Sequence, residues 1–400
     1  MRRVTVIRRL QRSGGTQSKA GGLTMLKIQV PFSDRKQQRK KRPRTLWKTM
    51  AAATVFIGHA LFINTSSAAI TLPGNYVDPY HQLVADAGYV EKTAQVNQVQ
   101  LSYVEGPDNG PPLVLLHAQL MDWFSYSRVM PELAQHFHVF NIDYPGHGKT
   151  VTPANYPMNA DQIGADLANF IENEIGEPVY ITGNSSGGLL ATWLAAYRPE
   201  LVTSVLLEDP PLFSSEYPRI TETIAYRAFR TSHEAATVDH PDDFLLYWID
   251  GNADFFRNNI GVGSPFILKQ TIKAYRLTHP NQPIELGIIK DDIVRLLLRG
   301  LDQYDPRFGA AFYDGSWNYG FDHATALMQI TAPTLLLHAN TEIMEDGTLN
   351  GAMSQEEADQ AASLLQNGTY VKVAAEHVVH LDNPQEFLRI LLDFFQPEEL

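Results

Sequence analysis

The chain has 400 residues, 44% of them hydrophobic and 10% aromatic, which is enough to form a large buried core. It contains no cysteine, so disulfides, zinc–thiolate sites, iron–sulfur clusters and a cysteine nucleophile are all excluded. The net charge of −12 is unevenly distributed, because residues 1–50 hold 15 of the 32 Lys and Arg side chains but only one acidic side chain. The other 350 residues carry a net charge of −26. An acidic body repels phosphate, so nucleic acid is not an expected partner.

The N-terminal part has the features of an export signal. Residues 1–45 form a basic arm that we expect to be disordered, and residues 46–72 combine a positive flank, a short apolar stretch and small residues. We therefore predict a signal peptide, with export and a mature chain beginning near Ala69 or Ile70. The uncharged stretch from Thr49 to Leu72 is also long enough for a signal anchor, which would place the protein at a membrane. A disordered arm followed by a surface helix is the remaining alternative.

From about Gln98 onward, short apolar runs alternate with amphipathic stretches. Continuous apolar runs of this length are typical of parallel strands covered on both faces. Helical patterns lie between or after them at 161–174, 187–197 and 385–395. The alternation predicts an α/β fold with a doubly wound, mostly parallel sheet. The predicted strands are 112–117, 138–143, 178–183, 202–209 and 333–338.

One long segment, residues 211–323, interrupts this alternation. It reads as helical and is rich in aromatic residues, and an insertion of this size between two strands suggests a cap over the site. Its aromatic side chains could either form the core of the cap or contact a substrate. They are Tyr247, Trp248, Phe255, Phe256, Phe312, Tyr313, Trp317 and Tyr319.

Residues 183–187 read Gly-Asn-Ser-Ser-Gly and match the pattern G-x-S-x-G directly after a predicted strand and before a predicted helix. In such a turn the serine is a nucleophile held in a strained conformation, and the small residues let the strand and helix approach each other. The N-terminus of the following helix directs N–H groups at a developing oxyanion. We therefore predict Ser185 as the nucleophile; a purely structural glycine turn is the alternative.

A second motif lies near the C-terminus, where His377 sits in a loop before the last predicted helix. A histidine in this position could take the proton of the serine as general base. His380 lies in the same loop and is expected to pack or hydrogen-bond beside it.

Together these motifs resemble the cap-bearing α/β-hydrolase superfamily over roughly residues 95–397. The residues that carry the resemblance are His117-Ala118-Gln119, Asp143-Tyr144-Pro145-Gly146-His147-Gly148, the turn at 183–187 and the loop of His377. The resemblance implies a core of residues 73–210 and 329–400, with a helical cap of residues 211–328 inserted after the sixth strand of the fold. It also implies an oxyanion hole formed by the backbone N–H groups of Gln119 and Ser186. Two positions depart from the family pattern, because Ala118 and Glu376 stand where the family usually has glycine.

The acid of the triad has two candidates. Asp209 follows the strand at 202–209, and Pro210 and Pro211 stiffen the chain after it. Glu342 lies four residues after His338, in the loop that follows the strand at 333–338. Either carboxylate could orient the imidazole of His377. We favour Asp209 slightly.

These residues predict a serine hydrolase that cleaves a carboxylic ester or lactone through an acyl-enzyme. The cap predicts a small apolar or aromatic substrate, and no motif for a metal or cofactor is present. C–C bond hydrolysis, amide hydrolysis and perhydrolysis use the same residues and stay open. So does a hydrolase fold that binds without catalysis.

Overall fold

A computed structural model of the chain describes residues 7–8, 76–259 and 261–396. The predicted N-terminal arm and signal segment lie outside the described residues, apart from Ile7 and Arg8. In the described part of the chain, no helix is long and apolar enough to cross a membrane.

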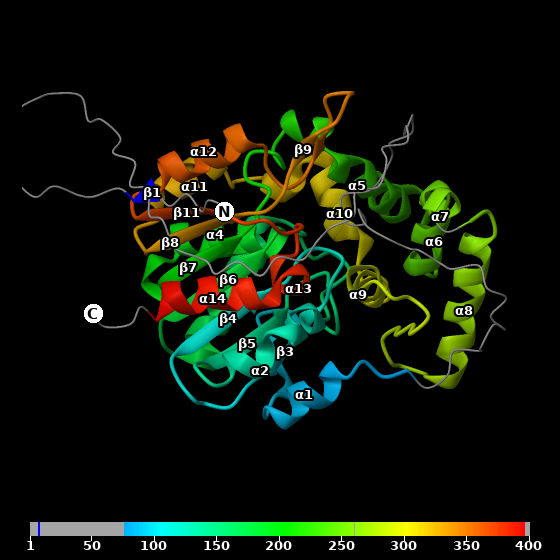
Figure 1. Cartoon of the computed structure of the whole chain (residues 1–400), viewed down its shortest axis with the longest axis horizontal. Helices are drawn as coiled ribbons and strands as arrows, with labels where there is room; N and C mark the ends of the chain where they lie inside the picture. The colour runs from blue at the N-terminus through cyan, green and yellow to red at the C-terminus, as the bar shows by residue number, and fades with distance from the viewer. Residues whose placement is uncertain (1–6, 9–75, 260, 397–400) are drawn as a thin grey trace, which may run out of the picture.

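The core is a nine-stranded sheet in the order β1-β11-β8-β7-β6-β4-β5-β3-β2 (Figure 1). Neighbouring strands from β11 to β5 are parallel, whereas β1, β3 and β2 pair antiparallel at the two edges. The predicted parallel α/β sheet is therefore confirmed, and β7 is the sixth strand of the fold counted from β2. The strands are β1 (Ile7–Arg8), β2 (Val90–Val96), β3 (Val99–Glu105), β4 (Pro112–Leu116), β5 (His138–Asp143), β6 (Val179–Asn184), β7 (Val202–Glu208), β8 (Thr334–His338) and β11 (Gly368–Lys372), with a separate hairpin of β9 (Glu342–Ile343) and β10 (Leu349–Asn350).

Helices cover both faces of the sheet, as continuous apolar strands require. One face packs against α3 (Ala160–Phe170), α4 (Ser186–Tyr197) and α12 (Gln355–Leu364). The other face packs against the 3₁₀ segment η1 (Trp123–Arg128) and α14 (Pro384–Phe395). Three short helices accompany that second layer: α1 (Tyr80–Asp86), α2 (Met130–Leu133) and α13 (Val379–Asp382).

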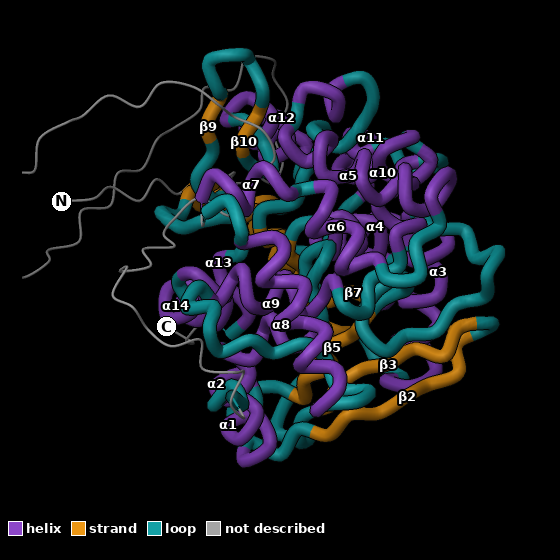
Figure 2. The backbone as a smooth tube through the Cα atoms, turned by 90° about the vertical axis from the view of Figure 1, so that its right-hand side faces the viewer, coloured by secondary structure: helices purple, strands orange, loops and turns teal. Residues whose placement is uncertain are grey.

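Every regular element that the structure describes between β7 and β8 is helical. Most of these helices gather at one side of the sheet and stand in front of it in Figure 2. The last of them, α11, instead lies against α4 and α12. The α-helices of this insertion are α5 (Ile224–Glu234), α6 (Phe244–Gly251), α7 (Ala253–Asn259), α8 (Ser264–Thr278), α9 (Asp292–Leu301), α10 (Pro306–Asp314) and α11 (His323–Gln329).

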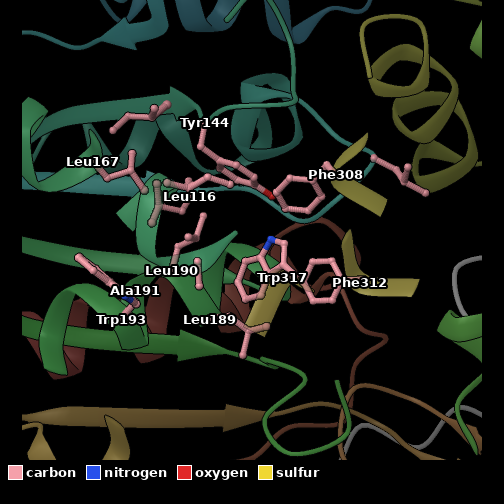
Figure 3. Packing of buried hydrophobic residues seen from close by; sticks show 14 of the residues in the cluster. Leu116, Tyr144, Leu167, Leu189, Leu190, Ala191, Trp193, Phe308, Phe312 and Trp317 are labelled. Carbon is pink, nitrogen blue, oxygen red and sulfur yellow. The ribbon is translucent and has the colours of Figure 1, made fainter. Parts of the chain in front are cut away.

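The inserted helices share the core of the sheet instead of forming a separate one. Phe308 and Phe312 of α10 lie beside Trp317 and Tyr144 (Figure 3). The rings of Phe312 and Trp317 stack with centroids 4.3 Å apart, and Tyr144 lies 5.8 Å from Phe308. This continuous packing places the inserted helices next to the ends of β4, β5 and β6, where the candidate residues lie.

Candidate active site

Ser185 occupies a strained turn between β6 and α4. Its φ of 56° and ψ of −121° belong to a region that a residue with a Cβ atom rarely adopts. The flanking glycines permit the turn, since a Cβ atom on Gly183 would lie 2.2 Å from the carbonyl oxygen of Gly187. A Cβ atom on Gly187 would lie equally close to the carbonyl oxygen of Leu116. Strand and helix can thus approach only with glycine at both positions.

His377 lies between β11 and α13, and Asp209 is the first residue after β7. The structure brings the two together, with Nδ1 of His377 2.7 Å from Oδ2 of Asp209. Oδ1 of Asp209 accepts a hydrogen bond of 3.0 Å from the backbone N–H of Ala339. Asp209 has a φ of 45°, so the chain turns sharply at the end of the strand. Both oxygens of this carboxylate therefore accept hydrogen bonds, which fixes the carboxylate against the imidazole.

Glu342 is not at this position. It is an exposed residue of the β9–β10 hairpin, paired across that hairpin with Asn350. Asp209 occupies the place beside the imidazole of His377. Of the two carboxylates considered as the triad acid, the structure brings Asp209 to the imidazole of His377.

The predicted oxyanion loop follows β4. Ala118 does not have a positive φ; the left-handed residue of this loop is Leu120, with a φ of 65°. Nδ1 of His117 lies 2.8 Å from the carbonyl oxygen of Ala118 and donates to it in the neutral imidazole. Burial lowers the pKa of His117 to about 3, so the ring stays neutral near neutral pH.

Tyr144 is a residue of this site that the sequence alone did not single out. Its hydroxyl lies 3.1 Å from the carbonyl oxygen of His117 and 2.9 Å from Oγ of Ser186. It thus connects the loop after β4 to the residue that follows Ser185. A second connection runs from Nε2 of Gln119 to the hydroxyl of Tyr304 in the inserted segment, at 2.6 Å. The one sequence signal for the contacts of Tyr144 with His117 and Ser186 was the position of Tyr144 within the motif at 143–148.

Asp143, at the end of β5, organises the same region. Its carboxylate accepts hydrogen bonds from the backbone N–H groups of Trp123, at 2.8 Å, and Lys149, at 3.3 Å. Burial raises the pKa of Asp143 to about 7, and the nearby charge of Asp122 adds to the shift. Through its two hydrogen bonds to backbone N–H groups, the side chain of Asp143 supports the loops beside the site.

Ser185 and His377 open into one cavity, together with Gln119 and Ser186. The space between atoms in this cavity is about 950 Å³, its open mouth included. Most of the remaining wall is apolar and comes from the inserted helices and the loops beside them. That wall includes Leu120, Ile220, Ile224, Ala225, Ala228, Phe229, Trp248, Leu297 and Phe312.

Two hydroxyls in the cavity wall beside the inserted helices are directed at backbone carbonyls. Ser214 donates to the carbonyl of Ala352, and Ser215 donates to that of Pro211. His377 is the one titratable side chain among the described residues that line the cavity. The described wall of the cavity therefore carries no carboxylate, lysine or arginine side chain. In the described ranges, no group of three or more His, Asp or Glu side chains could hold a metal ion.

The fold and this arrangement match a known family. Residues 113–390 fit the sequence model of the Alpha/beta hydrolase family, and the chain belongs to that family. The chain is 24% identical to a pimeloyl-[acyl-carrier protein] methyl ester esterase of Nitrosospira multiformis, over 75% of this chain and 99% of that protein. It is 22% identical to a serine hydrolase-like protein of Danio rerio, over 74% of this chain and 84% of the relative.

Solved structures agree on the fold. The enol-lactonase from Burkholderia xenovorans superposes with a TM-score of 0.51 at 18% identity, covering 76% of this chain and 99% of that one. The protein is therefore a hydrolase of the alpha/beta family.

Proposed function

We propose that the protein is a serine hydrolase that cleaves a carboxylic ester or lactone through an acyl-enzyme, with Ser185, His377 and Asp209 as its triad. One observation carries the proposal: His377, which lies 2.7 Å from Asp209, lines the same cavity as Ser185. A carboxylate at Nδ1 keeps the hydrogen on that nitrogen, so the other ring nitrogen can accept the proton of the serine.

The reaction follows from these roles. Oγ of Ser185 attacks the carbonyl carbon while its proton passes to Nε2 of His377. The backbone N–H groups of Gln119 and Ser186 hold the oxyanion, and each such donor is typically worth about 10²–10³ in rate. The imidazolium then protonates the departing alkoxide. A water molecule, deprotonated by the same imidazole, attacks the acyl-enzyme and releases the acid.

The cavity supports an apolar, uncharged substrate. An unpaired charge would lose its hydration on entering a cavity whose wall is made mostly of alkyl and aromatic groups, at a cost of several kcal/mol. The wall hydroxyls of Ser214 and Ser215 already donate to the backbone, so they offer little compensation to such a charge. We therefore propose small esters or lactones with an aliphatic or aromatic acyl group.

The same residues could act on an amide or a C–C bond or form a peracid, and a binding protein without catalysis is the alternative from another class. A panel of p-nitrophenyl esters and a fluorophosphonate label separates these functions. We expect Ser185→Ala to abolish both ester turnover and labelling. Ser214→Ala is the matched control, because Ser214 lines the same cavity but donates to the carbonyl of Ala352. If Ser185→Ala turns over the esters as fast as the wild type, Ser185 is not the nucleophile. If the fluorophosphonate does not label the wild type, a binding role is favoured.

We further propose export, or a membrane anchor through residues 49–72, on the basis of the charge step and the apolar stretch in the sequence.

A further inference from the structure

A second carboxylate–imidazole pair lies directly behind the proposed triad. Glu208, the last residue of β7, and His380 of α13 are both fully buried. Nδ1 of His380 lies 2.8 Å from Oε2 of Glu208 and 3.0 Å from Oε1. Both contacts require a hydrogen on Nδ1, since a carboxylate only accepts. Oε1 also accepts a hydrogen bond of 2.9 Å from the backbone N–H of His380.

Glu208 thereby fixes the loop that carries His377 to the end of β7. His380 is three residues beyond His377 and lies in the first turn of a four-residue helix, α13. A helix this short cannot hold its own position, because most of its backbone groups find no partner within it. The three contacts of His380 with the Glu208 carboxylate connect that turn to the central sheet.

The backbone of Glu208 holds the serine turn as well. Its carbonyl oxygen accepts hydrogen bonds from the backbone N–H of Ser185, at 3.0 Å, and from Nδ2 of Asn184, at 3.1 Å. Nδ2 of Asn184 also lies 2.9 Å from the carbonyl oxygen of His377. The residue after Glu208 is Asp209 itself. One residue therefore contacts the segments that carry all three members of the proposed triad.

The surroundings of the pair leave it little room to move. The ring of Tyr126 stacks on that of His380 with centroids 3.8 Å apart, and the Tyr126 hydroxyl lies 3.4 Å from Oε2 of Glu208. A buried carboxylate that lost these partners would be left without compensation, at a cost of several kcal/mol. The pair therefore permits one arrangement of the loop and disfavours others.

We propose that Glu208, through its pairing with His380, is a positioning residue that sets the imidazole of His377 between Ser185 and Asp209. This inference rests on the proposed serine mechanism. It assigns Glu208 no contact with substrate, so its removal should affect the chemical steps and leave substrate binding nearly unchanged. A displacement of a catalytic group by about 1 Å can cost about 10²-fold in rate.

The test replaces Glu208 by Gln, which keeps the shape of the side chain and removes the charge. We expect kcat for a p-nitrophenyl ester to fall by about 10- to 100-fold with KM changed less than about threefold. The matched control is Asp166→Asn, because Asp166 is also a fully buried carboxylate and accepts hydrogen bonds from Tyr156 and Asn97. Asp166→Asn should lower the melting temperature without lowering kcat in folded protein.

A spectroscopic readout separates positioning from stability. A hydrogen held between imidazole and carboxylate gives a low-field proton NMR signal, so the wild type should show one signal for each pair. Glu208→Gln should remove the signal of the Glu208–His380 pair and shift or broaden that of the His377–Asp209 pair. The spectrum of Asp209→Asn identifies which signal belongs to the His377–Asp209 pair. If Glu208→Gln does not fold, His380→Gln replaces it, and the same loss of kcat is expected.

Wild-type kcat in folded Glu208→Gln, or an unshifted His377–Asp209 signal, would overturn the inference while leaving the serine mechanism intact. An equal loss of kcat in Asp166→Asn would also overturn it, by making the effect one of general stability. Failure of the serine mechanism would instead appear as undiminished turnover by Ser185→Ala.

Discussion

The replacement of Asp209 by Asn tests the proposed triad most directly. The two side chains have nearly the same shape, so the change leaves the turn after β7 intact. It removes the negative charge and alters what the side chain offers to its two hydrogen-bond partners, which are Nδ1 of His377 at 2.7 Å and the backbone N–H of Ala339 at 3.0 Å. The aspartate accepts from both.

An asparagine cannot accept from both. If its oxygen stays on the N–H of Ala339, its NH₂ group faces His377 and forces Nδ1 to become an acceptor. The ring hydrogen then moves to Nε2, which can no longer take the proton of Ser185. If the amide flips, its NH₂ group faces the N–H of Ala339 and two buried donors oppose each other.

We therefore expect Asp209→Asn to lower kcat about 10⁴-fold, as loss of the correct tautomer does elsewhere. That factor corresponds to about 5.5 kcal/mol of transition-state stabilisation. The assay is steady-state hydrolysis of a p-nitrophenyl ester, with the melting temperature as a check on folding. Glu342→Gln is the control and should retain wild-type activity, because Glu342 is exposed in the β9–β10 hairpin. A larger loss in Glu342→Gln than in Asp209→Asn would refute the assignment, and small equal losses would mean that neither residue is the acid.

Three further predictions concern the substrate, acid stability and the N-terminus. Because no lysine or arginine side chain lines the described wall of the cavity, kcat/KM for a dicarboxylic acid monoester should be about 100-fold or more below that of the neutral ester of equal length. Equal values measured side by side would contradict an uncharged substrate. Although burial opposes ionisation of Asp78, hydrogen bonds from Arg128, the backbone N–H of Tyr80 and Arg295, together with the charge of Arg128, hold the pKa of its carboxyl below the usual 3.8. This carboxylate therefore stabilises the folded state above about pH 4, and the stabilisation disappears as the pH falls through the lower pKa of the folded state. Asp78→Asn should lower stability by about 3–5 kcal/mol at neutral pH and weaken the acid dependence in thermal unfolding; unchanged unfolding curves would argue against this role. Finally, N-terminal sequencing of protein from the native host should find a mature chain beginning near Ala69 or Ile70, whereas an intact arm on cytoplasmic protein would exclude export.

Local patterns in the sequence were sufficient to predict the main architecture. The strands predicted at 112–117, 138–143, 178–183, 202–209 and 333–338 correspond to β4 to β8 within one residue at each end. Such runs can be recognised as strands in the sequence because a strand buried on both faces must be apolar along its whole length. The turn at Ser185 was equally readable, because a strained turn between a strand and a helix needs small residues at fixed spacing.

Only the tertiary structure decided which groups meet. Asp209 and His377 are 168 positions apart, and the local patterns offered only a slight preference for Asp209 over Glu342 as the partner of the imidazole. The same holds for Glu208 and His380, for Tyr144 and Ser186, and for Gln119 and Tyr304. Polar side chains must find hydrogen-bond partners once they are buried. Which partner each one finds depends on the turn at Asp209, the course of the β9–β10 hairpin and the packing of the inserted helices, and these are properties of the folded chain as a whole.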